Sequence, residues 1–548
     1  MPLSPKAYTL LCGCFAATIH SPIRTLSNAT RPLAMSHNEG QLGSALYGYD
    51  LGVIASVIVS PDFLRVTGLE GTDTKTENYI GFITSSMLLG AFCGSIPASM
   101  LADKFSRRIG ITVYAVVFIL GGTLQTAAPN KEMMMAGRFI AGFSIGGMCL
   151  LVPLYQSEIS LPRFRGRLTT LQQFFLGWGA FLAGWIAYGC TRNQYGKPMQ
   201  WRLPLAFQMV PAIPLLFVVL VLPESPRWLM IRGREEEALQ VLAQLHARGD
   251  IHDPLVQGEF YEMKHKVEGE AAVAASWGEI FKKPENLRKV MLGIILQFSV
   301  QMTGVSFLQY YGPTIYGKVG YSTVTTLLLG AANSILGLIT QFTVCAWIDK
   351  LGRRRPLIIA NILSGSFFIG VMIISKKFSD NQGTATMARA FVAICWLWNM
   401  SFSPIGSLSW AYPVEIMNTA IRAKAVAITS MACWISNFMI GQVSPTAFSK
   451  LGWKYFILFV VCGFTNSFTM WALFPETKGR TLEEMDEYFR TTHWFVPLAK
   501  VEDVQAGERE AQLVEGKYPG MGDAIPASRK EDVANEKANG SIEENESI

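Results

Sequence analysis

The sequence predicts an all-α membrane protein with twelve transmembrane helices in two six-helix halves. Of its 548 residues, 50% are hydrophobic and only 16% are Asp, Glu, Lys or Arg, whereas a soluble protein carries roughly 25% charged residues. Charge is scarcest in stretches of about 20 residues, the length that a helix needs to cross the ~30 Å hydrocarbon core of a bilayer. A third observation is that landmarks of the first half of the chain recur in the second.

Twelve segments are long and apolar enough to be spans. We expect them at 42–60, 79–102, 109–128, 133–155, 168–190, 203–222, 290–311, 323–348, 356–375, 388–412, 421–445 and 453–474. The polar stretch after span 6 has apolar residues at helical spacing, which predicts short amphipathic helices. The expected units are an N-terminal cytoplasmic segment (1–41), an N-terminal six-helix half (42–222), a cytoplasmic helical linker (223–289), a C-terminal six-helix half (290–474) and a mostly disordered cytoplasmic tail (475–548).

The repeat supports two halves of like orientation. The matching landmarks lie 246 to 257 residues apart and are Asp103-Lys104-x-x-Arg107-Arg108 with Asp349-Lys350-x-x-Arg353-Arg354, Glu158 with Glu415, Trp201-Arg202 with Trp453-Lys454, and Pro223-Glu224 with Pro475-Glu476. Chance similarity of basic loops is the alternative. Two parallel six-span halves form a transporter architecture in which the substrate binds near the midplane between them.

The distribution of Lys and Arg predicts that both termini are cytoplasmic. Loops after spans 2, 4, 8 and 10 carry three of these residues per loop, against about two per loop on the other side, and the 223–289 loop adds ten. The net charge of +6 is spread over short loops, which argues against a nucleic-acid partner. We expect a monomer in the lipid bilayer, with the plasma membrane as its host.

Several short motifs resemble those of the sugar porters of the major facilitator superfamily, over about 42–490, and in particular fungal monosaccharide and polyol porters. The matching stretches are Gly48-Tyr49-Asp50-Leu51-Gly52-Val53, Gly137-Arg138, Pro153-Leu-Tyr155-x-x-Glu158, Arg165-Gly166-Arg167, Pro223-Glu224-Ser225-Pro226-Arg227-Trp228-Leu229 and Pro475-Glu476-Thr477-Lys478-Gly479-Arg480. The resemblance implies the major facilitator fold and alternating-access transport of a sugar or polyol.

Asp50 is an acid well inside a span, about ten residues or ~15 Å from its outer end. Ionisable groups at such depth are costly and usually mark an ion path. Arg138 in span 4 is within reach and would lower the pKa of the acid when near it. The resemblance implies that the two residues couple transport to protons; a purely structural ion pair is the alternative.

The basic loops are interpreted as a cytoplasmic gate. Such a gate forms when acids on each half pair with arginines at helix ends, hold the inner side shut and separate as the halves rock. The expected acids are Asp103, Glu158, Asp349 and Glu415, and their expected partners are Arg108, Arg165, Arg354 and Arg422. Charge that merely sets the topology explains the arginines but not the acid beside each cluster. The gate candidates are Asp103, Arg107, Arg108, Glu158, Arg165, Asp349, Arg353, Arg354, Glu415 and Arg422. The first cluster has Ser106 where the family has glycine, and the second keeps Gly352.

Sugars require amides and hydroxyls for their OH groups and aromatic rings for their C–H faces. The positions that match the family's pocket are Gln173, Gln297, Gln301, Ser306, Tyr310, Tyr311, Asn333, Trp410 and Trp434. Hydrogen bonding between helices is the alternative role for the polar members. Span 7 departs from the family pattern, with Val300 at a usual glutamine and Ser306 at a usual asparagine, and Cys433 replaces an amide in span 11. This pocket favours a polyol or deoxy sugar at least as much as glucose.

Other function classes find little support. No phosphate-binding loop GxxxxGK[ST], metal-ligand cluster or nucleophile–base set is present, so we expect neither an enzyme nor a cofactor. Within the transporter class, the alternative is a facilitative uniporter, which needs no acid at position 50. A non-transporting sugar sensor would be expected to have a long signalling tail and altered coupling residues.

The amino terminus fits the rest poorly. Polar residues 36–41 stand only nine positions before Asp50, so the first span is expected to be short at its cytoplasmic end. We expect weak order before residue 40, and with it a mis-assembled gene model or a poorly functional protein.

Overall fold

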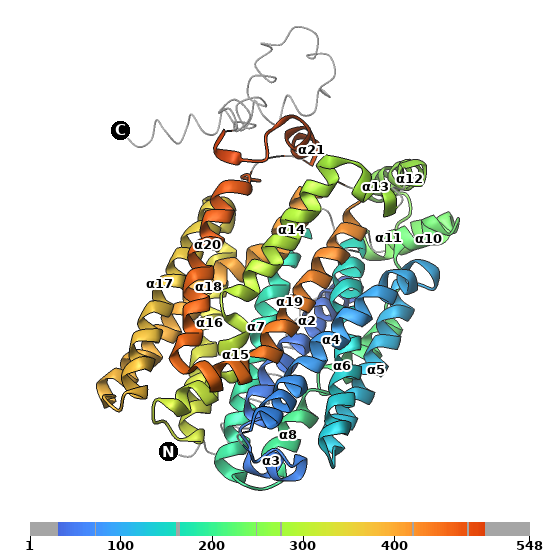
Figure 1. Ribbon diagram of the computed structural model, residues 1–548. Helices are drawn as coiled ribbons and strands as arrows, with labels where there is room; N and C mark the ends of the chain where they lie inside the picture. The colour runs from blue at the N-terminus through green and yellow to red at the C-terminus, as the bar shows by residue number, and fades with distance from the viewer. Residues whose placement is uncertain are drawn as a thin grey trace, which may run out of the picture.

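The computed structural model describes residues 31–498 except 72, 160–164, 248, 274–276, 419–420, 479 and 481. The side chains of 31–41 and of several other helical positions also lie outside the described part. All regular elements within it are helices. Figure 1 shows the long helices running side by side along one axis of the molecule.

The first half comprises four long helices, a bent first span and a broken sixth. Its elements are α2 (Arg31–Val57), α3 (Pro61–Thr67), α4 (Thr74–Lys104), α5 (Arg107–Ala127), α6 (Lys131–Ile159), α7 (Arg165–Gln194), α8 (Met199–Phe207) and α9 (Ala212–Val221). Helix α2 begins eleven residues before the expected start of span 1, and its apolar part is Leu42–Val57. The expectation of weak order at the amino terminus falls mainly on residues 1–30, outside the described residues.

The second half repeats this pattern after a helical linker. The linker contains α10 (Pro226–Ile231), α11 (Glu235–His246), α12 (Pro254–Val273) and α13 (Trp277–Lys282). The second half contains α14 (Pro284–Met302), α15 (Val305–Lys318), α16 (Thr323–Leu351), α17 (Arg354–Ser379), α18 (Ala385–Ile416), α19 (Arg422–Leu451), the short 3₁₀ helix η2 (Gly452–Tyr455) and α20 (Phe456–Leu473). Helix α21 (Leu482–Thr491) and the 3₁₀ turn η3 (Val496–Leu498) follow within the expected tail.

Twelve crossings account for these helices. Ten described segments can span a membrane, and the bent pair α2–α3 adds an eleventh. One of the ten, Lys424–Leu473, has 50 residues, or ~75 Å of helix, more than twice the hydrocarbon thickness. Its chain turns at Gly452, where φ is 54°, so it supplies two crossings. The prediction of a twelve-helix membrane protein is confirmed.

The linker helices and α21 lie at one end of the bundle, at the top of Figure 1, which we call the linker face. The other end, near α3 and α8, is the opposite face. Helix α11 is anchored by His246, whose Nδ1 lies 2.5 Å from Glu259 Oε2 and whose Nε2 lies 3.2 Å from the carbonyl oxygen of Ile159 at the end of α6.

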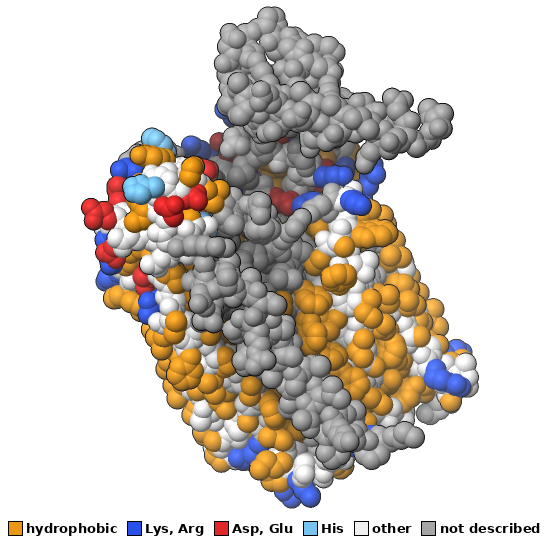
Figure 2. Space-filling model, turned by 180° about the vertical axis from the view of Figure 1, so that it is seen from behind, with side chains coloured by type: hydrophobic (Ala, Val, Ile, Leu, Met, Phe, Trp, Pro, Cys, Tyr) orange, Lys and Arg blue, Asp and Glu red, His pale blue; other side chains and the backbone are white. Residues whose placement is uncertain are grey.

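The flanks of the bundle are apolar. Figure 2 shows hydrophobic side chains covering most of the described surface between the two ends. Phe217 on α9, Phe342 on α16 and Phe468 on α20 are each more than 60% exposed. Such an apolar belt around internally hydrogen-bonded helices suits a hydrocarbon solvent.

Glycines allow α4 and α6 to pack backbone against backbone. A Cβ atom on Gly94 or Gly142 would stand 1.9 Å from a carbonyl oxygen of the other helix. Gly146 is equally tight, at 2.0 Å from the carbonyl oxygen of Ala91. Gly142 and Gly146 are four residues apart and so lie on one face of α6, and the close packing makes these helices a rigid unit.

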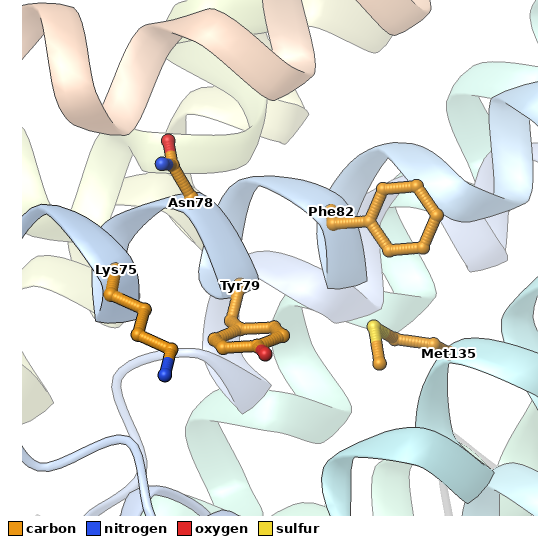
Figure 3. A pocket seen from close by; sticks show the side chains of 5 residues that line it. All are labelled: Lys75, Asn78, Tyr79, Phe82 and Met135. Carbon is orange, nitrogen blue, oxygen red and sulfur yellow. The ribbon is translucent and has the colours of Figure 1, made fainter.

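The two halves meet along two seams. Helices α7 and α16 form one seam, and α4 and α19 form the other. Near the opposite face, Gln442 of α19 accepts a hydrogen bond from Ser85 (3.0 Å) and donates to the carbonyl oxygen of Asn78 (3.2 Å), while Thr446 donates to the Asn78 side chain (2.8 Å). In Figure 3, Asn78 points to the side of α4 away from Lys75 and Tyr79. The α4–α19 seam is therefore closed at this end.

Candidate functional site

A cavity of about 310 Å³ lies between the two halves, lined by α2, α7, α15, α16 and α18. This volume is at the lower end of the range for small-molecule sites. Its lining is mainly small and apolar, with an aromatic surface from Trp398 and Phe402, whose rings stack with centroids 5.6 Å apart. The polar residues that line it include Gln173, Gln309, Asn333, Gln341 and Asn399.

Two polar pairs connect α16 and α18 along this cavity. Asn399 Nδ2 donates to Asn333 Oδ1 over 3.2 Å. Eight residues further along both helices, Gln341 Nε2 donates to Ser407 Oγ over 2.6 Å. Eight residues correspond to about two helical turns, or ~12 Å, so polar groups follow the wall through the central part of the bundle.

Of the predicted pocket residues, Gln173 and Asn333 line this cavity. The other polar members and the two tyrosines form hydrogen bonds within the protein, and the two tryptophans pack against aromatic rings. Gln301 accepts a hydrogen bond from Ser306 over 2.6 Å and contacts Cys433 Sγ at 3.6 Å. Gln297 donates to the carbonyl oxygen of Ser409 over 2.9 Å. These bonds tie the broken seventh span, α14 and α15, to α18 and α19.

The predicted aromatic residues form a second cluster around α19. Tyr310 donates to Asn437 Oδ1 over 3.1 Å, and Tyr311 donates to the carbonyl oxygen of Gly441 over 2.7 Å. Trp434 is fully buried, with ring centroids 5.4 Å from Tyr47 and 6.4 Å from Trp410. The cluster joins α19 to α2, α15 and α18 in this conformation.

Asp50 and Arg138 form a buried ion pair between α2 and α6. Asp50 Oδ1 lies 3.5 Å from Arg138 Nη1, and the side chains are 0% and 1% exposed. Neither carboxylate oxygen accepts a hydrogen bond from the described residues. Arg138 Nη2 reaches the carbonyl oxygen of Thr84 at 3.5 Å. Because this buried charge pair makes so few hydrogen bonds, they offset little of the free energy that its removal from water costs.

At the linker face, each half contains an arginine–glutamate pair. Arg107 binds Glu158 at 3.0 Å in the first half, and Arg353 binds Glu415 at 2.8 Å in the second. A hydroxyl supports each acid, because Ser225 donates to Glu158 over 2.6 Å and Thr477 donates to Glu415 over 2.5 Å. Both pairs join helices of the same half.

This pairing corrects part of the gate prediction. The partners of the two acids are Arg107 and Arg353, whereas Arg108 and Arg354 donate to carbonyl oxygens of Leu220 and Trp471, at the ends of the sixth and twelfth spans. Which arginine faces the acid depends on the rotation of the helix, which the motif leaves open. Arg422 donates to the carbonyl oxygen of Met417. The side chains of Asp103, Arg165 and Asp349 lie outside the described residues.

A second acid stands at the start of α5 and of α17. Glu476 accepts the backbone N–H groups of Arg353 (2.7 Å) and Arg354 (3.1 Å). The matching Glu224 accepts a hydrogen bond from the Ser106 hydroxyl over 3.1 Å. Burial raises the pKa of Glu224, and this rise is only partly offset by the Ser106 bond and by nearby arginines.

Twelve crossings in two like halves, with a cavity between the halves, define a secondary transporter of the major facilitator type. The match to known families places the chain within this class. A family model described as "Sugar (and other) transporter" matches residues 40–489. The chain therefore belongs to the sugar transporter family. It is a multi-pass membrane transporter of sugars, not an enzyme.

Curated relatives agree with this assignment. An MFS-type transporter of Aspergillus oryzae is 33% identical, over 82% of this chain and 83% of the relative. A high-affinity glucose transporter of Kluyveromyces lactis is 30% identical, over 85% of this chain and 88% of its own length. The resemblance to fungal sugar transporters is confirmed.

Solved structures confirm the fold. The proton:xylose symporter XylE bound to 6-bromo-6-deoxy-D-glucose has a TM-score of 0.68 at 23% identity, over 83% of this chain and 98% of that structure. A partially occluded, inward-open form of the xylose transporter XylE from E. coli also has a TM-score of 0.68, at 24% identity, over 82% of this chain and 99% of that structure.

Three amide residues of the cavity wall were absent from the sequence prediction: Gln309, Gln341 and Asn399. All three are uncharged polar residues inside expected spans, which is the same signal that selected Gln173 and Asn333. Composition alone does not tell which face of a span meets the cavity. Position 309 also follows the break at Gly304, where φ is 85°, so its direction does not continue the helical phase of α14.

Proposed function

We propose that this transporter carries a monosaccharide or polyol together with protons by alternating access. The observation that supports coupling is the Asp50–Arg138 pair, which is completely buried and has few hydrogen bonds. An acid held by one cation at 3.5 Å takes up a proton readily once that cation moves away. Both residues belong to the same half, so the movement that separates them is a shift of α2 relative to α6 during the transport cycle.

The direct test is Asp50→Asn in proteoliposomes with an imposed pH gradient and labelled sugar. The neutral side chain cannot exchange a proton, so we expect loss of uphill accumulation while sugar exchange without a gradient continues. Unchanged proton-driven accumulation would remove Asp50 from the mechanism. Loss of both activities together with folding would favour a structural ion pair, and gradient-independent uptake by the unmodified protein would favour a uniporter.

Asp62→Asn is a matched control for this test. Asp62 is also an acid in an apolar setting, 2% exposed, but it lies on α3 at the opposite face, where it pairs with Arg65 and accepts a hydrogen bond from Trp201 Nε1 over 3.1 Å. Its replacement removes a buried carboxylate without touching the Asp50–Arg138 pair. We expect that variant to retain proton-driven accumulation.

The orientation proposed here puts the linker face in the cytoplasm, with both termini on that side and the plasma membrane as host. The basic residues of the linker support it. An epitope tag in the loop between α12 and α13 should be accessible to antibody only after the cells are permeabilised. The protein is proposed to be a monomer. Light scattering in detergent should then report the mass of a single 60.5 kDa chain.

The cargo is proposed from the pocket and from the relatives. Relatives named as glucose transporters favour a hexose, whereas Val300 and Ser306 leave the seventh span poor in free amides. Ser306 is also bonded to Gln301. Uptake of labelled glucose, sorbitol and deoxy sugars by transporter-deficient cells that express this protein shows whether a hexose or a polyol or deoxy sugar is preferred. We expect Val300→Gln with Ser306→Asn to shift preference towards hexoses; strong preference for glucose before that change would contradict the pocket argument.

A further inference from the structure

Two amides of the cavity wall have no assigned role. Asn399 lies on α18 and Gln309 on α15, and both line the cavity that also contains Asn333. We propose that Asn399 and Asn333 bind a pair of neighbouring hydroxyl groups on the ligand, with Gln309 as a third contact. This inference rests on the proposed transport of a sugar or polyol and identifies residues that select the ligand.

The hydrogen bond between the two asparagines leaves complementary groups free. Asn399 Nδ2 donates to Asn333 Oδ1, so the Asn333 amino group and the Asn399 carbonyl oxygen remain, and the described residues supply no hydrogen bond to either. Exchanging oxygen and nitrogen in both amides leaves the same combination of one donor group and one acceptor. The pair therefore presents a donor and an acceptor side by side to the cavity.

Neighbouring hydroxyls of a sugar or polyol suit this combination. Each hydroxyl is both a donor and an acceptor, so one can accept from the Asn333 amino group while the next donates to the Asn399 carbonyl. A compound that lacks either hydroxyl leaves one amide group of the pair without a partner on the ligand. Sites built from hydrogen-bonding groups discriminate strongly against such analogues.

The surroundings of Asn399 provide a surface for the apolar side of the ligand. Trp398 and Phe402, on the same helix, have stacked rings that line the cavity, with an interplanar angle of 15°. Trp398 is fixed in place because its Nε1 donates to Ser364 over 2.6 Å. An aromatic surface beside hydrogen-bonding amides is the combination that a sugar needs for its C–H face and its hydroxyls.

Gln309 completes the set as a lining residue of the same cavity, from α15. No hydrogen bond joins its amide to the described residues, and its side chain is only partly buried. It lies on α15, the short helix after the break at Gly304. Its amide is thus available to a ligand, whereas Gln297 and Gln301 are engaged in bonds to the protein.

The test compares binding of D-glucose with its deoxy analogues at positions 2, 3 and 4. Purified full-length protein in detergent is titrated calorimetrically, because binding does not require transport. Because the seventh span is poor in free amides, most hydroxyls lack a strict partner, and the two that meet the asparagine pair are the exception. We therefore expect one of the deoxy analogues, and not all three, to bind the unmodified protein about tenfold more weakly than glucose, which corresponds to one lost hydrogen bond. In Asn399→Leu we expect glucose affinity to fall about tenfold and this discrimination to disappear.

Two further variants separate contact with the ligand from damage to the fold. Asn399→Asp keeps the acceptor and should retain more of the discrimination than Asn399→Leu. Asn361→Leu is the matched control, because this amide lies on α17 outside the cavity and donates to a backbone carbonyl of its own helix. The control should leave both affinity and discrimination unchanged.

The outcomes distinguish this inference from the proposed function. Unaltered affinity and discrimination in Asn399→Leu would overturn the role of the asparagine pair while sugar binding still stood. Equal losses in Asn361→Leu and Asn399→Leu would also overturn it, since both would then report a general effect on the fold. Failure of the unmodified protein to bind any of these sugars would remove the proposed cargo itself.

Discussion

At the linker face, the two halves cap the start of a helix, α5 in the first half and α17 in the second, with different groups. In the second half, Glu476 accepts two backbone N–H groups at the start of α17, and both of its oxygens are used. In the first half, Ser106 caps α5 with its own hydroxyl, which accepts the N–H of Ile109 at 3.1 Å. Glu224 then receives only the Ser106 hydroxyl, and its other oxygen is buried without a hydrogen bond from the described residues.

The difference follows from one residue. Gly352 has a φ of 79°, a conformation that L residues rarely adopt, and a Cβ there would stand 2.6 Å from Glu476 Oε2. Ser106 has a different backbone conformation, with φ and ψ both 159°. Glycine thus allows the acid after the twelfth span to cap a helix from another part of the half, whereas serine caps the helix locally. The acid is thus present in both copies of the repeat, but it makes fewer hydrogen bonds to the neighbouring helix in the first copy than in the second.

The ion pairs provide the largest expected contrast between the halves. The side chains of Arg107 and Glu158 are 5% and 4% exposed, against 16% and 29% for Arg353 and Glu415. We expect Glu158→Gln to lower the free energy of unfolding by about 3 kcal/mol, because it leaves a charge in a dry site. Glu415→Gln should cost about 1 kcal/mol. Thermal unfolding of both variants in detergent measures the difference, and equal losses would contradict it.

Exchanging the capping residues tests the second contrast. Gly352→Ser places a side chain in a strained conformation and against Glu476, so we expect a loss of about 2–3 kcal/mol. Ser106→Gly removes one local cap and should cost about 1 kcal/mol. The same unfolding measurement applies. A serine tolerated at 352 without loss would show that the capping by Glu476 is dispensable.

The smallest expected effect is a pH dependence confined to the first half. A raised pKa means that the folded state binds the proton of Glu224 more tightly than the unfolded state does. Its contribution is therefore fully present below the unfolded pKa of about 4.3 and is lost as the pH rises through the raised folded value. Relative to Glu224→Gln, the unmodified protein should become less stable over this interval.

Unfolding midpoints of the two proteins, measured from pH 4 to 8, report this effect. Two curves that stay parallel over the range would contradict the prediction. Glu236→Gln on the exposed side of α11 is a suitable control, because this residue lies in the same linker-face region but on the surface.

The sequence predicted the architecture well because its signals are local. Hydrophobic length identifies a span whatever its neighbours are, and the repeated landmarks establish two halves. The partners of Glu158 and Glu415 were harder to predict, since the choice between adjacent arginines depends on the rotation of α5 and α17. The cavity wall was harder still. The breaks after α14 and α2 change the direction of the following residues, so positions such as 309 could not be placed by helical periodicity.

The hydrogen bonds between α4 and α19 have a consequence for the sidedness of transport. Gln442 and Thr446 make three hydrogen bonds to Asn78 and Ser85 near the opposite face. At about 1 kcal/mol each, they hold this entrance closed in all but roughly one molecule in a hundred. A ligand arriving there binds only the open fraction, so its apparent affinity falls by the same factor. Substrate should therefore saturate the transporter at lower concentration from the linker face, and Gln442→Ala should reduce that asymmetry.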